Sequence, residues 1–96
     1  MYVKIHKSET AKIIAVCDED LIGKEFEEGN LYLKVSETFF KGEKKNKNEI
    51  KKILKDANSA NFVGKESVSI AVELGLVDKK NIIKIKGVSH AQYFEL

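Results

Sequence analysis

Arginine, proline and tryptophan are absent from this chain of 96 residues, so all 17 of its basic side chains are lysine. Arginine is the side chain that makes forked hydrogen bonds to phosphate groups and to guanine edges. Its absence excludes that mode of base reading. Any contact with a nucleic acid must therefore depend on lysine charges, backbone N–H groups and aromatic rings, which favours recognition of shape or phosphate.

Cysteine occurs once, at Cys17, and a single cysteine excludes an internal disulfide. This cysteine usage suits a reducing compartment. Long hydrophobic runs are missing as well, because no segment approaches the roughly 20 apolar residues of a membrane span. The first ten residues lack the apolar core of a signal peptide. We therefore expect a cytoplasmic protein that has no membrane partner.

The residues that are present suffice for one modest hydrophobic core. Hydrophobic residues make up 43% of the chain and charged residues 33%, so much of the surface must be ionic. A chain of this length has no room for a second core, and we expect residues 1–96 to form a single domain. The formal net charge of +2 does not by itself predict a class of partner.

Strands are indicated mainly in the first half of the chain. Alternating apolar and polar residues predict strands over residues 1–7 and 31–36. Residues 12–17 are more continuously apolar, which predicts a strand buried on both faces and paired with the first as a hairpin. A brief extended piece is expected over residues 24–28 and a further strand over residues 82–88. No element is predicted for the remaining tail.

Two helices are predicted in the second half. The first follows the exposed loop "KGEKKNKNEI", with Asn46 or Asn48 as its cap and apolar residues at helical spacing from Ile50 to Ala57. The stretch "NSANFVGK" interrupts it, and the second helix spans residues 66–74. Strands gathered before helices indicate the α+β class, with a small, mainly antiparallel sheet and two helices packed on one face.

Cys17 ends an apolar run and is followed by three acids, in "AVCDEDLIG". A reactive thiolate needs nearby positive charge, whereas these acids would raise the pKa of the thiol. We interpret Cys17 as the buried end of a strand and Asp18 as the cap of a short helical turn. A metal site would require both to converge with His6 and His90, and the chain has neither C-x-x-C nor H-x-x-x-H spacing. We therefore expect no metal and no other cofactor.

His90 is the more informative histidine, because small residues flank it beyond Gly87 in "KGVSHAQ". An imidazole at the end of a sheet can carry function, and Gln92 would lie on the same side of an extended segment. The alternative is a histidine bonded to nearby backbone. Motifs for a serine nucleophile, a P-loop or a dinucleotide are absent, so no catalytic residue is predicted. The Gly–Lys pair in "NFVGKES" opens a helix whose N–H groups could hold a phosphate.

The distribution of charge is the strongest functional signal. Residues 41–55 hold seven lysines against two glutamates, a balance of +5, whereas residues 18–28 hold six acids against one lysine, a balance of −5. A basic loop followed by a basic helix face is the electrostatic footprint of phosphate binding, although a solvated helix face has the same composition. The candidate nucleic-acid-binding residues are Lys41, Lys44, Lys45, Lys47, Lys51, Lys52 and Lys55, with Tyr32, Phe39 and Phe40 as candidate stacking residues.

Three stretches together resemble a known family. "MYVKIHKSETAKIIAVCDEDLIGKEF", "ANFVGKESVSIAVELGLVD" and "GVSHAQ" are similar, in register, to the archaeal domain-of-unknown-function family 424. The resemblance implies an α+β fold and an archaeal, cytoplasmic protein, and it brings no established activity. Ser89 departs from a family pattern that often has proline before the histidine. The matching positions are Cys17, Asp18, Leu21, Gly23, Lys24, Asn61, Gly64 and His90.

Three hypotheses of function follow. The leading one is a non-enzymatic module that binds RNA or a ribonucleoprotein through the lysine-rich loop and helix. The second is a small enzyme or ligand-binding domain, and the third is a homo-oligomer joined through the complementary acidic and basic regions. If the family's stretches meet in space, the second hypothesis has a candidate pocket formed by Cys17, Asp18, Lys24, Asn61, Gly64 and His90.

Overall fold

Eight strands, three α-helices and two short 3-10 turns make up residues 1–95, which the computed structural model describes. The strands are β1 (Tyr2–Lys7), β2 (Lys12–Cys17), β3 (Glu25–Glu28), β4 (Leu31–Lys34), β5 (Glu43–Lys44), β6 (Ser59–Val63), β7 (Ile83–Ile85) and β8 (Val88–Phe94). The helices are α1 (Glu37–Phe40), α2 (Lys47–Leu54) and α3 (Lys65–Glu73), and the turns are η1 (Glu19–Leu21) and η2 (Lys79–Asn81).

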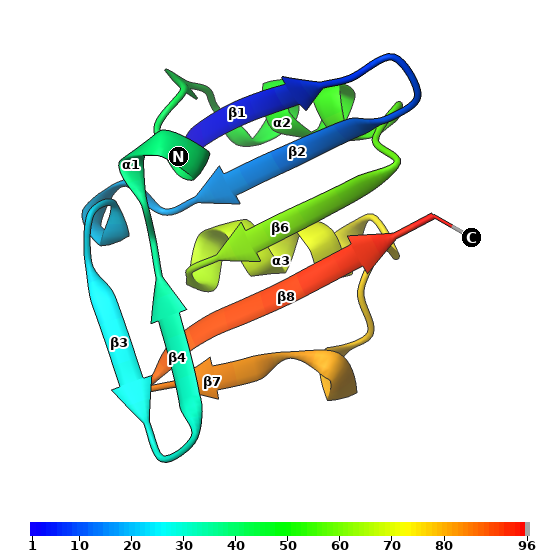
Figure 1. Cartoon of the computed structure of the whole chain (residues 1–96). Coiled ribbons are helices and arrows are strands. Elements are labelled where there is room, and N and C mark those ends of the chain that lie inside the picture. Colours follow the sequence, from blue (N-terminus) through cyan, green and yellow to red (C-terminus); the bar gives the residue numbers. More distant parts are fainter. Residues whose placement is uncertain (96) are drawn as a thin grey trace.

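Six of these strands form one mixed sheet in the order β5-β1-β2-β6-β8-β7, and β3 pairs with β4 in a separate hairpin (Figure 1). The pair β2–β6 is parallel and the other pairs are antiparallel. The predicted α+β class and mainly antiparallel sheet are confirmed. Among residues 1–95, no helix combines the length and apolar character that crossing a membrane requires.

Helices α2 and α3 lie close to the positions that the sequence predicted for them. The side chain of Asn46 accepts a hydrogen bond from the backbone N–H of Glu49, and the Glu49 carboxylate accepts one from the backbone N–H of Asn46. This reciprocal capping box starts α2. Helix α3 begins one residue earlier than predicted and ends at Glu73.

Strands β5, β6 and β8 depart from the prediction, and α1 is a third helix where two were predicted. Strand β5 lies in the stretch that was predicted to be an exposed loop. The stretch "NSANFVGK" contains β6, a central strand that has β2 on one side and β8 on the other, so its polar residues do not break the sheet. The predicted strand over residues 82–88 is a hairpin of β7 and β8, and the unassigned tail supplies most of β8. Lys86 and Gly87 form the turn with φ values of 52° and 79°, the left-handed conformation that two-residue hairpins require.

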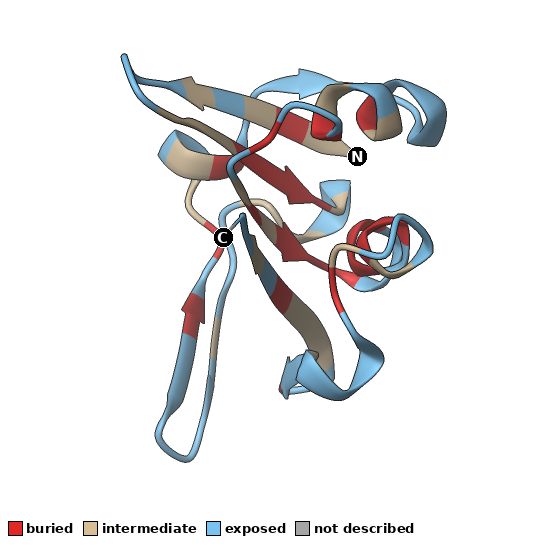
Figure 2. Cartoon of the chain, turned by 90° about the vertical axis from the view of Figure 1, so that its right-hand side faces the viewer, coloured by how far each residue is buried: buried red, intermediate tan, exposed pale blue. Residues whose placement is uncertain are grey.

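The two sides of the sheet are covered differently. Helices α2 and α3 pack on one side, over a core centred on Ile14, Phe62 and Ile70. On the other side, α1 and the β3–β4 hairpin cover only one end of the sheet, over a second cluster that contains Cys17, Val35 and Phe40. Figure 2 shows α3 and the hairpin on opposite sides of the sheet. Among residues 1–95, no helix or hairpin covers the remainder of the second side.

Candidate functional site

Asp18 joins the end of β2 to the start of α3. Its carboxylate accepts hydrogen bonds from the backbone N–H of Glu66 at 3.1 Å, from the backbone N–H of Ser67 at 2.9 Å and from the Ser67 hydroxyl at 2.8 Å. The expected role as cap of its own turn is wrong, since Asp18 makes no side-chain cap bond in η1. It caps a helix that begins almost 50 residues later in the chain.

Gly64 completes this junction. Its φ of 107° is a conformation that L side chains rarely adopt, and a Cβ at this position would overlap the Asp18 carboxylate. The Asp18 carboxylate also occupies the first N–H groups of α3, so the helix start in "NFVGKES" has fewer N–H groups with which to hold a phosphate. The contact between Asp18 and Gly64 is therefore structural.

Cys17 is fully buried, with 0% of its surface exposed, in the cluster beneath α1 and the hairpin. Burial raises the pKa of the thiol to about 11, and the negative charge of Asp18 adds to the shift. The predicted direction of the acidic contribution is confirmed, although burial is the larger cause. A thiol that stays protonated and closed to solvent at neutral pH does not supply a nucleophile.

The remaining pocket candidates lie in two places. Lys24 is exposed at the start of the hairpin, where its backbone pairs with Val35. Asn61 and His90 lie on the neighbouring strands β6 and β8, and the side-chain N–H of Gln92 donates a hydrogen bond to Asn61 Oδ1 at 2.9 Å. The structure thus brings Asn61 and His90 together with Gln92, whereas Cys17 is sealed off and Lys24 points to solvent from another element.

His90 fits both interpretations given from the sequence, a histidine bonded to nearby backbone and an imidazole at the surface of the sheet. Its Nδ1 lies 3.1 Å from the backbone carbonyl oxygen of Phe62, so the bond to nearby backbone is present. The side chain is nevertheless part of a partly exposed surface rather than of a core. Within residues 1–95, His, Cys, Asp and Glu side chains do not gather in groups of three or more that would suit a metal ion.

The uncovered part of the sheet forms a continuous surface, which we call the open face. Strand register places alternate residues of five strands on the same side as His90. Ala15, Cys17, Val63 and Ile85 on this side are buried, and the open face is formed by residues that keep some exposure. None of them is a carboxylate, although the chain has 15 acids. The open face consists of Lys4, His6, Ile13, Ser59, Asn61, Ile83, His90, Gln92 and Phe94.

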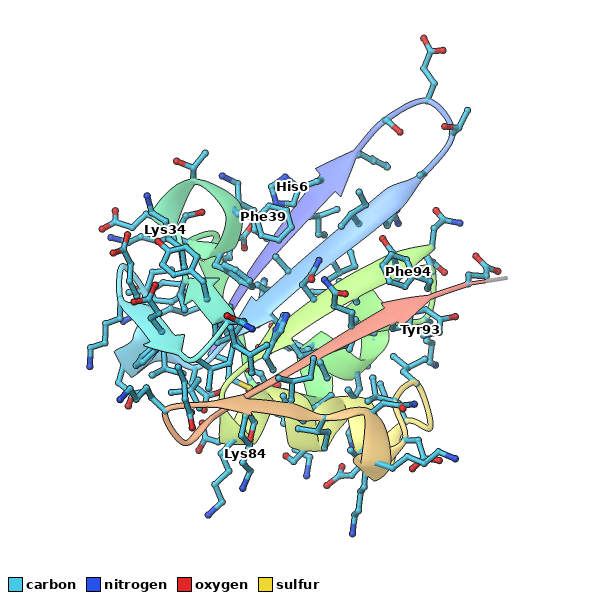
Figure 3. All side chains as sticks on the ribbon, turned by 60° about the horizontal axis from the view of Figure 1, so that its bottom comes forward. His6, Lys34, Phe39, Lys84, Tyr93 and Phe94 are labelled. Atoms are coloured by element: carbon cyan, nitrogen blue, oxygen red, sulfur yellow. The ribbon has the colours of Figure 1, made fainter. Side chains whose placement is uncertain are left out.

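Aromatic rings lie at both ends of the open face (Figure 3). His6 stacks on Phe39 of α1 with ring centroids 4.6 Å apart, and His6 Nε2 lies 2.9 Å from the Phe39 carbonyl oxygen. At the C-terminal end of β8, Phe94 is 66% exposed. Of the three predicted stacking residues, only Phe39 borders this surface, since Phe40 is buried and Tyr32 lies on the hairpin. Phe94 was missed because no strand was predicted for the tail.

Acidic partners reduce the charge of the predicted lysine surface. Lys47 and Lys51 each lie 2.8 Å from the Glu73 carboxylate of α3, and their hydrogen bonds lower the pKa of Glu73 to about 2. Lys45 pairs with Glu43 and Glu49, and Lys44 pairs with Glu19 from the acidic region. Lys41, Lys52 and Lys55 make no ion pair within the described residues, and all three are exposed.

A hollow of about 650 Å³ lies on the helical side, between α3 and the region of η2 and β7. Val68, Val72 and Ile82 contribute apolar surface to it, and three lysines also line it (Lys65, Lys79 and Lys84). The lysines favour an anion, but the Glu73 carboxylate also lines the hollow, and nothing in the lining selects a particular ligand.

The family model described as a protein of unknown function, DUF424, matches residues 6–96. The chain belongs to the DUF424 family. A crystal structure of an uncharacterised conserved protein from the archaeon Methanopyrus kandleri is similar to it, with 27% sequence identity and a TM-score of 0.81, covering 99% of this chain and 90% of that chain. No curated protein matches this DUF424 chain significantly. The resemblance noted from the sequence is confirmed. The family is described as being of unknown function and the Methanopyrus kandleri protein as uncharacterised, so neither assigns an activity.

Proposed function

We propose that this DUF424 protein is a non-enzymatic domain that binds RNA or a ribonucleoprotein, with unpaired bases on the open face and phosphates on the lysines. The observation that supports this most is the chemistry of the open face. It carries an exposed phenylalanine, a stacked histidine and two side-chain amides, and it carries no carboxylate. Sheet surfaces of this kind bind single-stranded RNA by stacking bases on rings and bonding their edges to polar side chains.

The lysine-rich loop and helix adjoin one edge of this face. Strand β5 pairs with β1, and Lys44 lies opposite Tyr2 with its ammonium group 5.6 Å from the centre of that ring. Lys41 precedes β5, and α2 follows it on the other side of the sheet. A strand of RNA that leaves the open face across this edge could place phosphates near Lys41 beside β5, and a longer strand could continue to α2 and its exposed lysines Lys52 and Lys55. Phosphates in this region would be neutralised by lysine alone.

The alternative is a small enzyme or ligand-binding domain at Cys17, Asp18, Asn61 and His90. Catalysis by the thiol would require Cys17 to reach solvent as a thiolate, and its burial and raised pKa oppose both. The Asp18 carboxylate already accepts three hydrogen bonds from α3. What remains accessible is the group formed by Asn61, His90 and Gln92, which suits binding better than covalent chemistry.

The test is the affinity of the protein for a fluorescent single-stranded RNA, measured by anisotropy across a range of salt. Because phosphate contacts release counterions, affinity should fall steeply between about 50 and 200 mM salt. The double variant Lys52→Glu, Lys55→Glu should weaken binding by roughly tenfold or more and flatten the salt dependence. Lys24→Glu, Lys34→Glu is the matched control, since it makes the same change of charge at two exposed lysines of the β3–β4 hairpin region.

Three results would contradict this proposal. The first is no detectable binding of RNA, and the second is binding that does not change with salt. The third is an equal loss of affinity in the hairpin control, which would indicate a general effect of net charge. A loss confined to the α2 variant supports the lysine-rich helix as the phosphate contact.

A further inference from the structure

The open face contains a hollow of about 270 Å³ beside β8. It is lined by Asn81, Ile83, His90, Ala91, Gln92 and Phe94. Sites for drug-sized ligands typically occupy about 300–1,000 Å³, so this hollow suits something smaller, such as a single planar ring. The residues come from η2, β7 and β8, which the sequence did not bring together.

Two large apolar side chains form its walls. Phe94 is 66% exposed and Ile83 is 46% exposed, although both belong to strands of the central sheet. Their apolar surface is therefore available to a ligand, and a flat ring that lies against Phe94 would bury part of it. Base stacking on aromatic side chains is tolerant of sequence because every base has a π-face.

The polar groups in the hollow have a defined hydrogen-bonding pattern. The Phe62 carbonyl can only accept, so the hydrogen of a neutral His90 ring is on Nδ1, and Nε2 is left as an acceptor. The Gln92 side-chain N–H donates to Asn61, which orients the amide and leaves Gln92 Oε1 as a second acceptor. Two acceptors match a ligand edge that carries N–H donors.

We propose that this hollow binds one unpaired nucleobase and prefers a base with an exocyclic amino group over uracil. The inference rests on the proposed RNA-binding function and adds to it the position and the preference of one base. An exocyclic amino group has two N–H bonds and can donate to both acceptors, whereas uracil offers them one N–H, at N3, beside a 4-oxo group that is a further acceptor. Cytosine and uracil give the sharpest comparison, because both are pyrimidines and they differ along one edge only.

The first experiment follows the NMR signals of the protein as cytidine or uridine is added. These nucleosides carry no phosphate, so the readout does not depend on the lysines. We expect cytidine to shift the signals of His90, Gln92 and Phe94 more than uridine does. The second experiment compares the affinities of the protein for oligo(C) and oligo(U). One hydrogen bond corresponds to a preference of about fivefold for oligo(C).

Variants of the residues that line the hollow test whether the preference for oligo(C) arises there. Gln92→Ala and His90→Ala should each reduce the ratio of the two affinities toward one, while salt-dependent binding remains. Asn48→Ala removes an exposed amide on α2 and should leave the ratio unchanged. If His90→Ala fails to fold, the ratio of affinities measured for Gln92→Ala alone tests the proposal.

The outcomes separate the two proposals. Equal affinities for oligo(C) and oligo(U), with no nucleoside-induced shifts at the hollow, would overturn the base site and leave salt-dependent RNA binding standing. Shifts at the hollow without any RNA binding would support the base site and refute the proposed function. Shifts confined to residues outside the hollow would also overturn the base site.

Discussion

The two sides of the six-stranded sheet use the same strands but are covered to different extents. On the helical side, Ile14, Phe62 and Ile70 are completely buried between the sheet and α2 and α3. On the other side, α1 and the β3–β4 hairpin bury one end around Cys17, and Phe94 lies exposed at the other end. Two helices can close one side, whereas a four-residue helix and a four-residue hairpin arm cannot close the other. The uncovered area can contact a partner without disturbing the core.

The largest expected effect tests this difference in burial directly. Phe62→Ala should destabilise the protein by about 3–5 kcal/mol, because it leaves a cavity in a closed core. Phe94→Ala should change the free energy of unfolding by less than about 0.5 kcal/mol, because the ring is mostly in water. Urea unfolding followed by circular dichroism measures both. Similar losses for the two variants would mean that Phe94 packs against something in the folded protein.

A smaller effect on stability is expected at Asp18, whose carboxylate connects the end of β2 to the start of α3. Asp18→Ala removes three hydrogen bonds and should cost about 1–3 kcal/mol, with loss of helical signal from α3. Asp20→Ala is the matched control, because Asp20 is an exposed acid two residues away and should change stability little. Equal stability of the two variants would show that the cap is not made in solution.

The smallest effect is expected outside the core, where Glu73 links α3 to Lys47 and Lys51 of α2. The folded pKa of Glu73 is lowered from 4.5 to about 2, so its contribution to stability is present above about pH 4.5 and is lost as the pH falls toward 2. Glu73→Gln should remove that part of the acid dependence. Because the pair is exposed, added salt should weaken the effect. Acid unfolding curves that coincide for both proteins at low salt would contradict this role.

Features that depend on neighbouring residues were predictable. The capping box of Asn46 and Glu49 lies within one helical turn, so its residues could be recognised in the sequence. The alternation in β1 and β4 and the buried character of β2 were visible for the same reason. The burial of Cys17 followed from the apolar run that precedes it.

Features that depend on distant partners were not predictable. Asn61 and Gly64 look like residues that end structure, yet Asn61 lies in a central strand because β2 and β8 supply its hydrogen bonds. The Asp18–α3 cap joins residues almost 50 positions apart. The count of seven lysines in residues 41–55 also overstated the charge of that surface, because Glu73 and Glu19 approach it from elsewhere in the chain.

The sequence by itself determined the α+β class, the cap of α2, the absence of arginine chemistry and the membership of a family, because each depends on composition or on residues a few positions apart. The tertiary structure alone decided which side of the sheet stays open, which lysines keep their charge uncompensated, and that Asn61 of β6 lies on the same surface as His90, Gln92 and Phe94 of β8. Those outcomes depend on strand register and on contacts across many residues, which no local pattern encodes.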